Sequence, residues 1–221
     1  MAELLLHDRK IESPYLLRLF GITEKEFEQL TDEDLKAELL DGVMIVHSPA
    51  TWRHDDVMGF LLVLMRGYAE AKGLGKVTGP NTIMQVERGR RFAPDLMFIR
   101  QERVKLPLAK QFKGAADLVV EVLSEHTRSY DLTEKRPVYR EAKISEIWFV
   151  DEAARQLIID RRRANTYEEE VVSTGLVRSK VLVGFWLDVG WLWQERLPDP
   201  LRCLEQIMHS AEPAAQRDQL E

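Results

Sequence analysis

Two stretches decide the fold: Pro94-Asp95-Leu96-Met97-Phe98-Ile99 and Asp117-Leu118-Val119-Val120-Glu121-Val122-Leu123. Both are short, rich in aliphatic residues and bounded by polar or Pro- and Gly-containing segments, which predicts two buried strands. Each carries a carboxylate where a core strand should be apolar, Asp95 in the first and Glu121 in the second. A buried carboxylate is costly unless it is paired, protonated or bound to a cation. The pair therefore indicates a divalent metal shared by adjacent strands.

A polar helix is expected from Tyr130 to Ala142, directly after the second strand. Asp131, Lys135 and Tyr139 are four residues apart, so they share one helical face that can point at the carboxylates. Pro137 is expected to bend this helix or to mark a late start.

The segment before the first strand contains a further carboxylate, Glu38. Thr31 is expected to cap a helix that runs through Leu39, and Asp41-Gly42 then turns the chain into a strand over 43–46. Glu38 at the end of that helix is either part of the metal site or a solvated carboxylate, and the residues alone leave both interpretations open.

The remaining elements follow from periodicity and turn signals. An amphipathic helix is expected over 51–72, with His54 in its first turn, and the strand over 82–86 is expected to form a hairpin with the Asp95 strand. Later segments predict a strand over 146–150, a hairpin of 156–160 and 166–172 that turns through Arg161 to Asn165, and a helix over 197–208. Four aromatic residues near this end suggest packing onto the same chain or a second copy, so a homodimer is expected: Phe185, Trp186, Trp191 and Trp193.

In this order the motifs resemble the PD-(D/E)XK phosphodiesterase superfamily, and within it the putative restriction endonuclease family of small bacterial proteins. The resemblance runs from Thr23 to Val189 and includes these pieces: Glu38-Leu39-Leu40-Asp41-Gly42, Ser48-Pro49, His54, Pro94-Asp95, Glu121-Val122-Leu123-Ser124, Lys135 to Tyr139 and Glu146-Ile147-Trp148-Phe149-Val150-Asp151. It implies an α/β, restriction endonuclease-like fold, which is a mixed central β-sheet flanked by helices, with a C-terminal β-hairpin and helix.

The resemblance also implies a metal-dependent nuclease site. Asp95, Glu121 and the backbone carbonyl of Val122 would hold Mg²⁺ or Mn²⁺, with Glu38 assisting, and Lys135 would orient a water or balance charge on the phosphate. The superfamily's standard lysine position, two residues after the glutamate, is Leu123 here, and the resembled family supplies its lysine from the following helix.

The candidates for substrate binding are five: His54, Arg88, Arg90, Arg91 and Tyr139. The segment from Arg88 to Lys113 has eight basic and two acidic residues, whereas the whole chain has a net charge of −6. A phosphate backbone is attracted to such a segment, although charge alone favours a pair of solvated loops.

Length and composition predict one domain over 23–210, preceded by a leader over 1–22 and followed by a flexible tail over 211–221. The chain has 221 residues, 45% of them hydrophobic, and one cysteine, Cys203, which excludes an internal disulfide. With neither a membrane-spanning run nor a signal-peptide pattern at Met1 to Asp8, a cytoplasmic location is expected.

Three functions use these residues. The first is hydrolysis of phosphodiester bonds in DNA, and the second is hydrolysis of another phosphate ester. The third is a catalytically inactive module with a DNA-binding or protein-interaction role, for which Leu123 and the acidic net charge are the motivation. Nucleotide motors, acyl hydrolases and thiol enzymes are disfavoured because the sequence lacks a Gly-rich phosphate loop, a Ser-His-Asp order and a CxxC pair.

Overall fold

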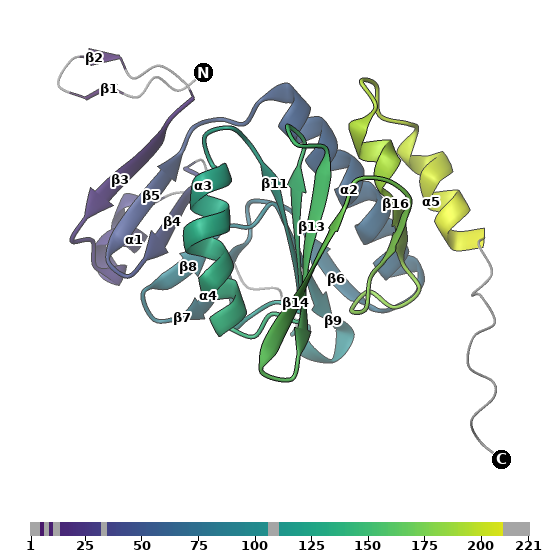
Figure 1. The fold of residues 1–221 in the computed structure, drawn as a ribbon. Coiled ribbons are helices and arrows are strands. Elements are labelled where there is room, and N and C mark those ends of the chain that lie inside the picture. Colours follow the sequence, from purple (N-terminus) through teal and green to yellow (C-terminus); the bar gives the residue numbers. More distant parts are fainter. Residues whose placement is uncertain (1–4, 7–8, 11–13, 32–34, 106–110, 210–221) are drawn as a thin grey trace.

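The computed structural model describes residues 5–6, 9–10, 14–31, 35–105 and 111–209 (Figure 1). The tail predicted over 211–221 lies outside these residues. The strands are β1 (Leu5–Leu6), β2 (Arg9–Lys10), β3 (Leu16–Phe20), β4 (Ala37–Leu40), β5 (Val43–His47), β6 (Gly75–Thr78), β7 (Ile83–Glu87), β8 (Arg90–Phe92), β9 (Leu96–Arg100), β10 (Gln111–Lys113), β11 (Leu118–Leu123), β12 (Glu146–Asp151), β13 (Gln156–Arg163), β14 (Thr166–Val172), β15 (Leu176–Arg178) and β16 (Trp186–Asp188). The helices are α1 (Glu24–Leu30), α2 (Trp52–Ala71), η1 (Gln101–Arg103), α3 (Arg128–Tyr130), the π-helical η2 (Asp131–Lys135), α4 (Arg136–Glu141), η3 (Val189–Trp193) and α5 (Pro200–His209).

Two six-stranded sheets form the body of the protein. The first sheet has the order β10-β7-β8-β4-β5-β3, and the second has the order β14-β13-β12-β11-β9-β6. In the second sheet β11 runs parallel to β12 and antiparallel to β9. The α/β class, the mixed sheet, and the C-terminal hairpin and helix are therefore confirmed, and so is the prediction that the two carboxylate-bearing stretches lie side by side.

Helices cover the two faces of the second sheet differently. Alternate residues such as Val120 and Val122 join a core with α2, α5 and the C-terminal segment, whereas Val119 and Leu123 join a core with α4. Figure 1 shows α2 and α5 next to each other, and the helical segment from α3 to α4 between the first sheet and β11 to β13. Each face of β11 is therefore buried, as its continuous apolar sequence requires.

The predicted helix from Thr31 through Leu39 is wrong. Thr31 ends helix α1 instead, and Ala37–Leu40 forms strand β4, which pairs with β5 through a tight turn. Asp41 and Gly42 at this turn have positive φ angles of 48° and 85°, as a two-residue hairpin turn requires. Glu38 therefore lies within a strand, and burial of Ala37 and Leu39 against α1 sends its side chain to the opposite face.

Two hairpin predictions need correction. The hairpin partner of β7 is β8, and the Asp95 stretch enters β9 in the other sheet, because the chain crosses between the sheets at Ala93 to Asp95. Arg161 to Arg163 belong to strand β13 rather than to a turn. Arg161 binds Glu170 across the hairpin, so its charge is already paired within the sheet.

The aromatic cluster packs within the chain. Trp186 contacts Trp191, and Trp191 meets Phe60 of α2 edge to face. This explains the clustered tryptophans by intramolecular packing, so they give no support to the predicted homodimer. Among the described residues, no helix is both long and apolar enough to span a membrane.

Candidate active site

Asp95 and Glu121 face each other because of strand register and alternation. Val120 pairs with Leu96 in the antiparallel β9–β11 ladder, so one further step places Glu121 opposite Asp95. Both side chains point to the face occupied by α4. The backbone N–H of Asp95 lies 3.4 Å from Oε2 of Glu121, and both residues are buried.

Lys135 joins three carboxylates that come from different elements. Its Nζ atom is 2.6 Å from Oε1 of Glu121, 3.2 Å from Oε1 of Glu38 and 3.3 Å from Oδ1 of Asp131. An ammonium has three N–H donors, so each carboxylate can receive one of them. Lys135 thereby links β11 of the second sheet, β4 of the first sheet and its own helix.

The π-helical segment brings the predicted helical face into contact with the carboxylates. Asp131–Lys135 form the π-turn, and α4 continues it with Pro137 near its start. Such insertions are frequent at functional sites. Tyr139, one turn after Lys135, donates a hydrogen bond of 2.7 Å from its hydroxyl to Oε1 of Glu121.

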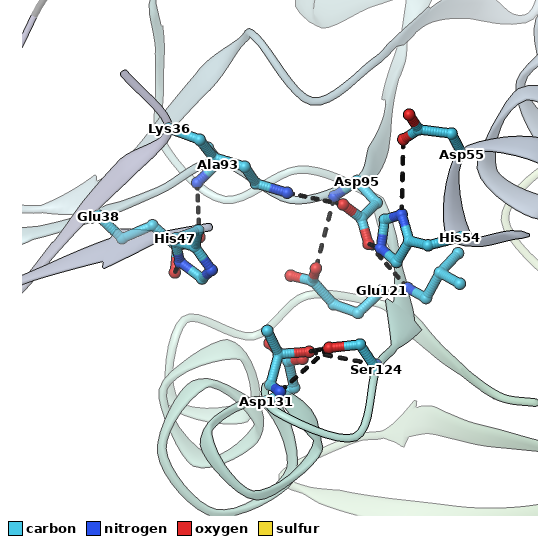
Figure 2. A network of polar contacts seen from close by, with 12 residues as sticks. Lys36, Glu38, His47, His54, Asp55, Ala93, Asp95, Glu121, Ser124 and Asp131 are labelled. Atoms are coloured by element: carbon cyan, nitrogen blue, oxygen red, sulfur yellow. Dashed lines mark hydrogen bonds and ion pairs between the residues drawn. The ribbon is translucent and has the colours of Figure 1, made fainter. Parts of the chain in front are cut away.

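Asp95 is held by three donors (Figure 2). Nζ of Lys36 lies 2.9 Å from Oδ1, Nε2 of His54 lies 3.2 Å from Oδ2, and the backbone N–H of Val122 donates to Oδ2 at 2.9 Å. His54 sits in the first turn of α2, whose N-cap is Thr51. The structure therefore places His54 against a carboxylate of the site.

Glu38 is fixed from both sides of the junction between the sheets. Its Oε1 accepts a 2.9 Å hydrogen bond from the backbone N–H of Ala93, which is the crossing point between the sheets. Its Oε2 lies 3.1 Å from Nε2 of His47 on β5. These contacts bring Glu38 to the same site as Lys135.

The electrostatics of the site are dominated by an excess of buried carboxylates. Burial, together with the charges of Asp131, Asp95 and Glu38, raises the pKa of Glu121 to about 8 in spite of Lys135. Burial works against ionisation of Glu38 as well, but Lys135 and His47 outweigh it and hold the pKa of Glu38 below its usual range. Burial disfavours the charge of Lys135, but Glu121 and Glu38 outweigh this effect and raise the pKa of Lys135. This side chain therefore stays an ammonium.

Two of the three predicted arginines lie on carboxylates outside this cluster. Arg90 binds Asp41, Glu87 and Glu141. Buried Arg91 binds Glu24 and Glu28 of α1. Arg88 is exposed and lines a hollow beside α1. The charges of Arg90 and Arg91 are thus neutralised by neighbours, and Tyr139, the fifth substrate-binding candidate, lies inside the cluster.

The donor atoms fit a hard divalent cation. Asp95 and Glu121 offer carboxylate oxygens on adjacent strands, the ligand type that Mg²⁺ and Mn²⁺ prefer. A divalent charge would also offset the burial and the repulsion that together raise the pKa of Glu121. Across the described residues, no three His, Cys, Asp or Glu side chains already form a cation cage. The carboxylates instead pair with ammonium groups, Asp95 with Lys36 and the other three with Lys135.

Sequence reasoning missed Lys36 and gave His47 no role. Lys36 comes directly before β4, a segment that was assigned to a helix. Once Ala37–Leu40 is a strand, Lys36 and Glu38 share one face by alternation, and this face meets the second sheet. His47 would have followed from pairing β5 with β4 in the register that joins Ala37 to Val46.

A carboxylate–lysine cluster thus lies where the two sheets of a mixed α/β framework meet. The chain belongs to the family described as "Putative restriction endonuclease" (Uma2), whose sequence pattern matches residues 24–190. Among solved structures it is similar to a putative nuclease of the DUF820 group from Anabaena variabilis ATCC 29413. That similarity has a TM-score of 0.67 and 17% identity, and it covers 78% of this chain and 97% of the other. No curated protein matches the chain.

Proposed function

We propose that this protein is a metal-dependent endonuclease that hydrolyses phosphodiester bonds in DNA, with Mg²⁺ or Mn²⁺ as its cofactor. The observation that carries the proposal is the convergence of Glu121 and Glu38 on Lys135, with Asp95 directly beside Glu121. Membership in the restriction endonuclease family supports the same reaction. The expected homodimer stays part of the proposal and is tested by the mass of the protein in solution.

The roles of the residues follow from their positions. Asp95 and Glu121, with the carbonyl of Val122, would hold the cation, which would lower the pKa of a bound water and polarise the scissile phosphate. Lys135 remains protonated and is suited to orient the attacking water or to balance charge on the phosphate. His54 keeps Asp95 in place through Oδ2.

Cleavage of supercoiled plasmid in Mn²⁺ or Mg²⁺ tests the proposal. Asp95→Asn should abolish cleavage, because the amide offers a weaker cation ligand without charge. Asp41→Asn is the matched control, since Asp41 is exposed at the β4–β5 turn and binds Arg90. Cleavage by the wild-type protein that survives Asp95→Asn would remove this site from the mechanism.

A titration of Mn²⁺ into both proteins by calorimetry needs no assumption about the substrate. Saturable binding that Asp95→Asn removes, together with cleavage, would support the proposed enzyme. If neither the wild-type protein nor the variant binds Mn²⁺ or cleaves DNA, the inactive module is the better description.

A further inference from the structure

We infer that Lys36 is a displaceable counter-ion of Asp95, which occupies this carboxylate in the metal-free protein and competes with the divalent cation for it. The inference rests on the proposed function, because it concerns the same cation site. It adds a residue that controls when the site accepts its metal.

The contacts of Asp95 are the basis of this inference. Nζ of Lys36 is 2.9 Å from Oδ1, and Oδ2 receives His54 and Val122. A Mg²⁺ ion on Oδ1 would lie about 2.1 Å from that oxygen. With Lys36 unmoved, the two cations would be at most about 5 Å apart inside a buried site, where like charges repel strongly.

Lys36 is free to withdraw in a way that Lys135 is not. One third of the Lys36 side chain is exposed, at 33%, compared with 2% for Lys135. The ammonium of Lys36 meets the carboxylate of Asp95, whereas Lys135 is held by three carboxylates. A four-carbon stem can carry the Lys36 ammonium into water without moving the strand.

The charge balance favours this exchange. Four buried carboxylates, Glu38, Asp95, Glu121 and Asp131, share the ammonium groups of Lys36 and Lys135. Replacing one ammonium by a divalent ion adds positive charge where it is lacking. Lys36 therefore keeps Asp95 paired until a cation with the higher charge arrives.

Calorimetric titration of Mn²⁺ into Lys36→Met tests this competition. We expect Lys36→Met to bind Mn²⁺ about tenfold more tightly than the wild-type protein, since one competing charge is gone. Lys36→Arg keeps the charge and should bind no more tightly than the wild type. Lys76→Met is the matched control, because Lys76 pairs with Glu70 on the surface, and its affinity should be unchanged.

Thermal unfolding provides a second readout. With a chelator, Lys36→Met should melt below the wild-type protein, because Asp95 loses a partner, and saturating Mn²⁺ should remove or reverse this difference. If the chelator result showed Lys36→Met unfolded, Lys36→Gln would take its place. Equal or weaker Mn²⁺ binding by Lys36→Met, or by Lys36→Gln in its place, while the wild type binds, would overturn the competition alone. Absence of Mn²⁺ binding in every protein would overturn the proposed function with it.

Discussion

The ammonium of Lys135 lies 2.6 Å from Oε1 of Glu121, and both side chains are almost fully buried. Water does not reach this pair, so the loss of Lys135 would leave Glu121, Glu38 and Asp131 without their common cation. Lys135 is also the group that connects the two sheets, because Glu38 of the first sheet and Glu121 of the second both contact it.

Lys135→Met should therefore lower the free energy of unfolding by about 3 to 5 kcal/mol, the usual cost of breaking a buried ion pair. Lys76→Met, at the surface pair with Glu70, should cost less than about 1 kcal/mol. Chemical denaturation in a chelating buffer measures both values. Similar small losses for the two variants would show that the buried carboxylates find other compensation.

Glu121→Gln is expected to stabilise the metal-free protein at alkaline pH. The folded-state pKa of Glu121 is about 8 against an ordinary value of 4.5, so the folded state binds this proton more tightly than the unfolded state. Wild-type stability should therefore decline as the pH rises from 4.5 towards 8, whereas Gln does not titrate. Melting curves across this range should show that the melting temperature of the variant rises relative to that of the wild type as the pH increases. A constant difference would contradict the raised pKa.

Asp160→Asn should change how the stability of the protein depends on pH in acid. Asp160 is buried and binds Arg136 and Arg140 of the helix that follows Lys135. Burial alone would raise its pKa, but these two guanidinium groups lower it below its ordinary value of 3.8. The ion pairs therefore contribute stability above pH 3.8 and lose it as the pH falls through the lower folded-state pKa.

The variant should accordingly be less stable than the wild type near neutral pH, and the difference should shrink in acid. Thermal melts at a series of acidic pH values measure the difference. Asp41→Asn is the comparison, because its partner Arg90 is also held by Glu87 and Glu141. A difference that persisted at the acid end would assign the stability to packing rather than to charge.

Gly75→Ala should destabilise the second sheet. A Cβ at Gly75 would lie 2.1 Å from the backbone oxygen of Ile99 on β9, and the φ angle of Gly75 is +150°. We expect a loss of about 3 kcal/mol or more from overpacking and backbone strain. Gly73→Ala is the matched control: its φ is also positive, at +64°, but no atom lies within 4 Å. Strain alone costs the control about 1 to 2 kcal/mol, and equal losses would exclude the steric clash.

Much of the framework could be predicted from the sequence because the deciding signals are local. The strands around Asp95 and Glu121 and the helix with Lys135 follow from short apolar runs and from helical spacing. The strand containing Glu38 was missed because its four residues, Ala37–Leu40, give too short a pattern to separate from a helix end. Lys36 directly precedes this strand and was missed with it. Its contact with Asp95 also joins residues 59 positions apart, which no local pattern reveals.

The proposed DNA-binding arginines show a different limit. Charge along the sequence reveals how many cations a segment carries but not which carboxylates will meet them after folding. Arg91 is neutralised by Glu24 and Glu28, which lie more than sixty residues earlier in the chain. The net positive charge of a segment therefore does not translate into a free positive surface.

The chain crosses between the two sheets at Ala93 to Asp95, so the site combines residues from both sheets. The site can therefore form only late in synthesis. Glu38 is made early, but its partner Lys135 leaves the ribosome almost one hundred residues later, and strand β12, which pairs with β11 beside Glu121, comes later still. A growing or truncated chain thus holds carboxylates without their cation. Under the proposed function, nuclease activity would appear only in the finished molecule, so incomplete copies would not cut nucleic acid.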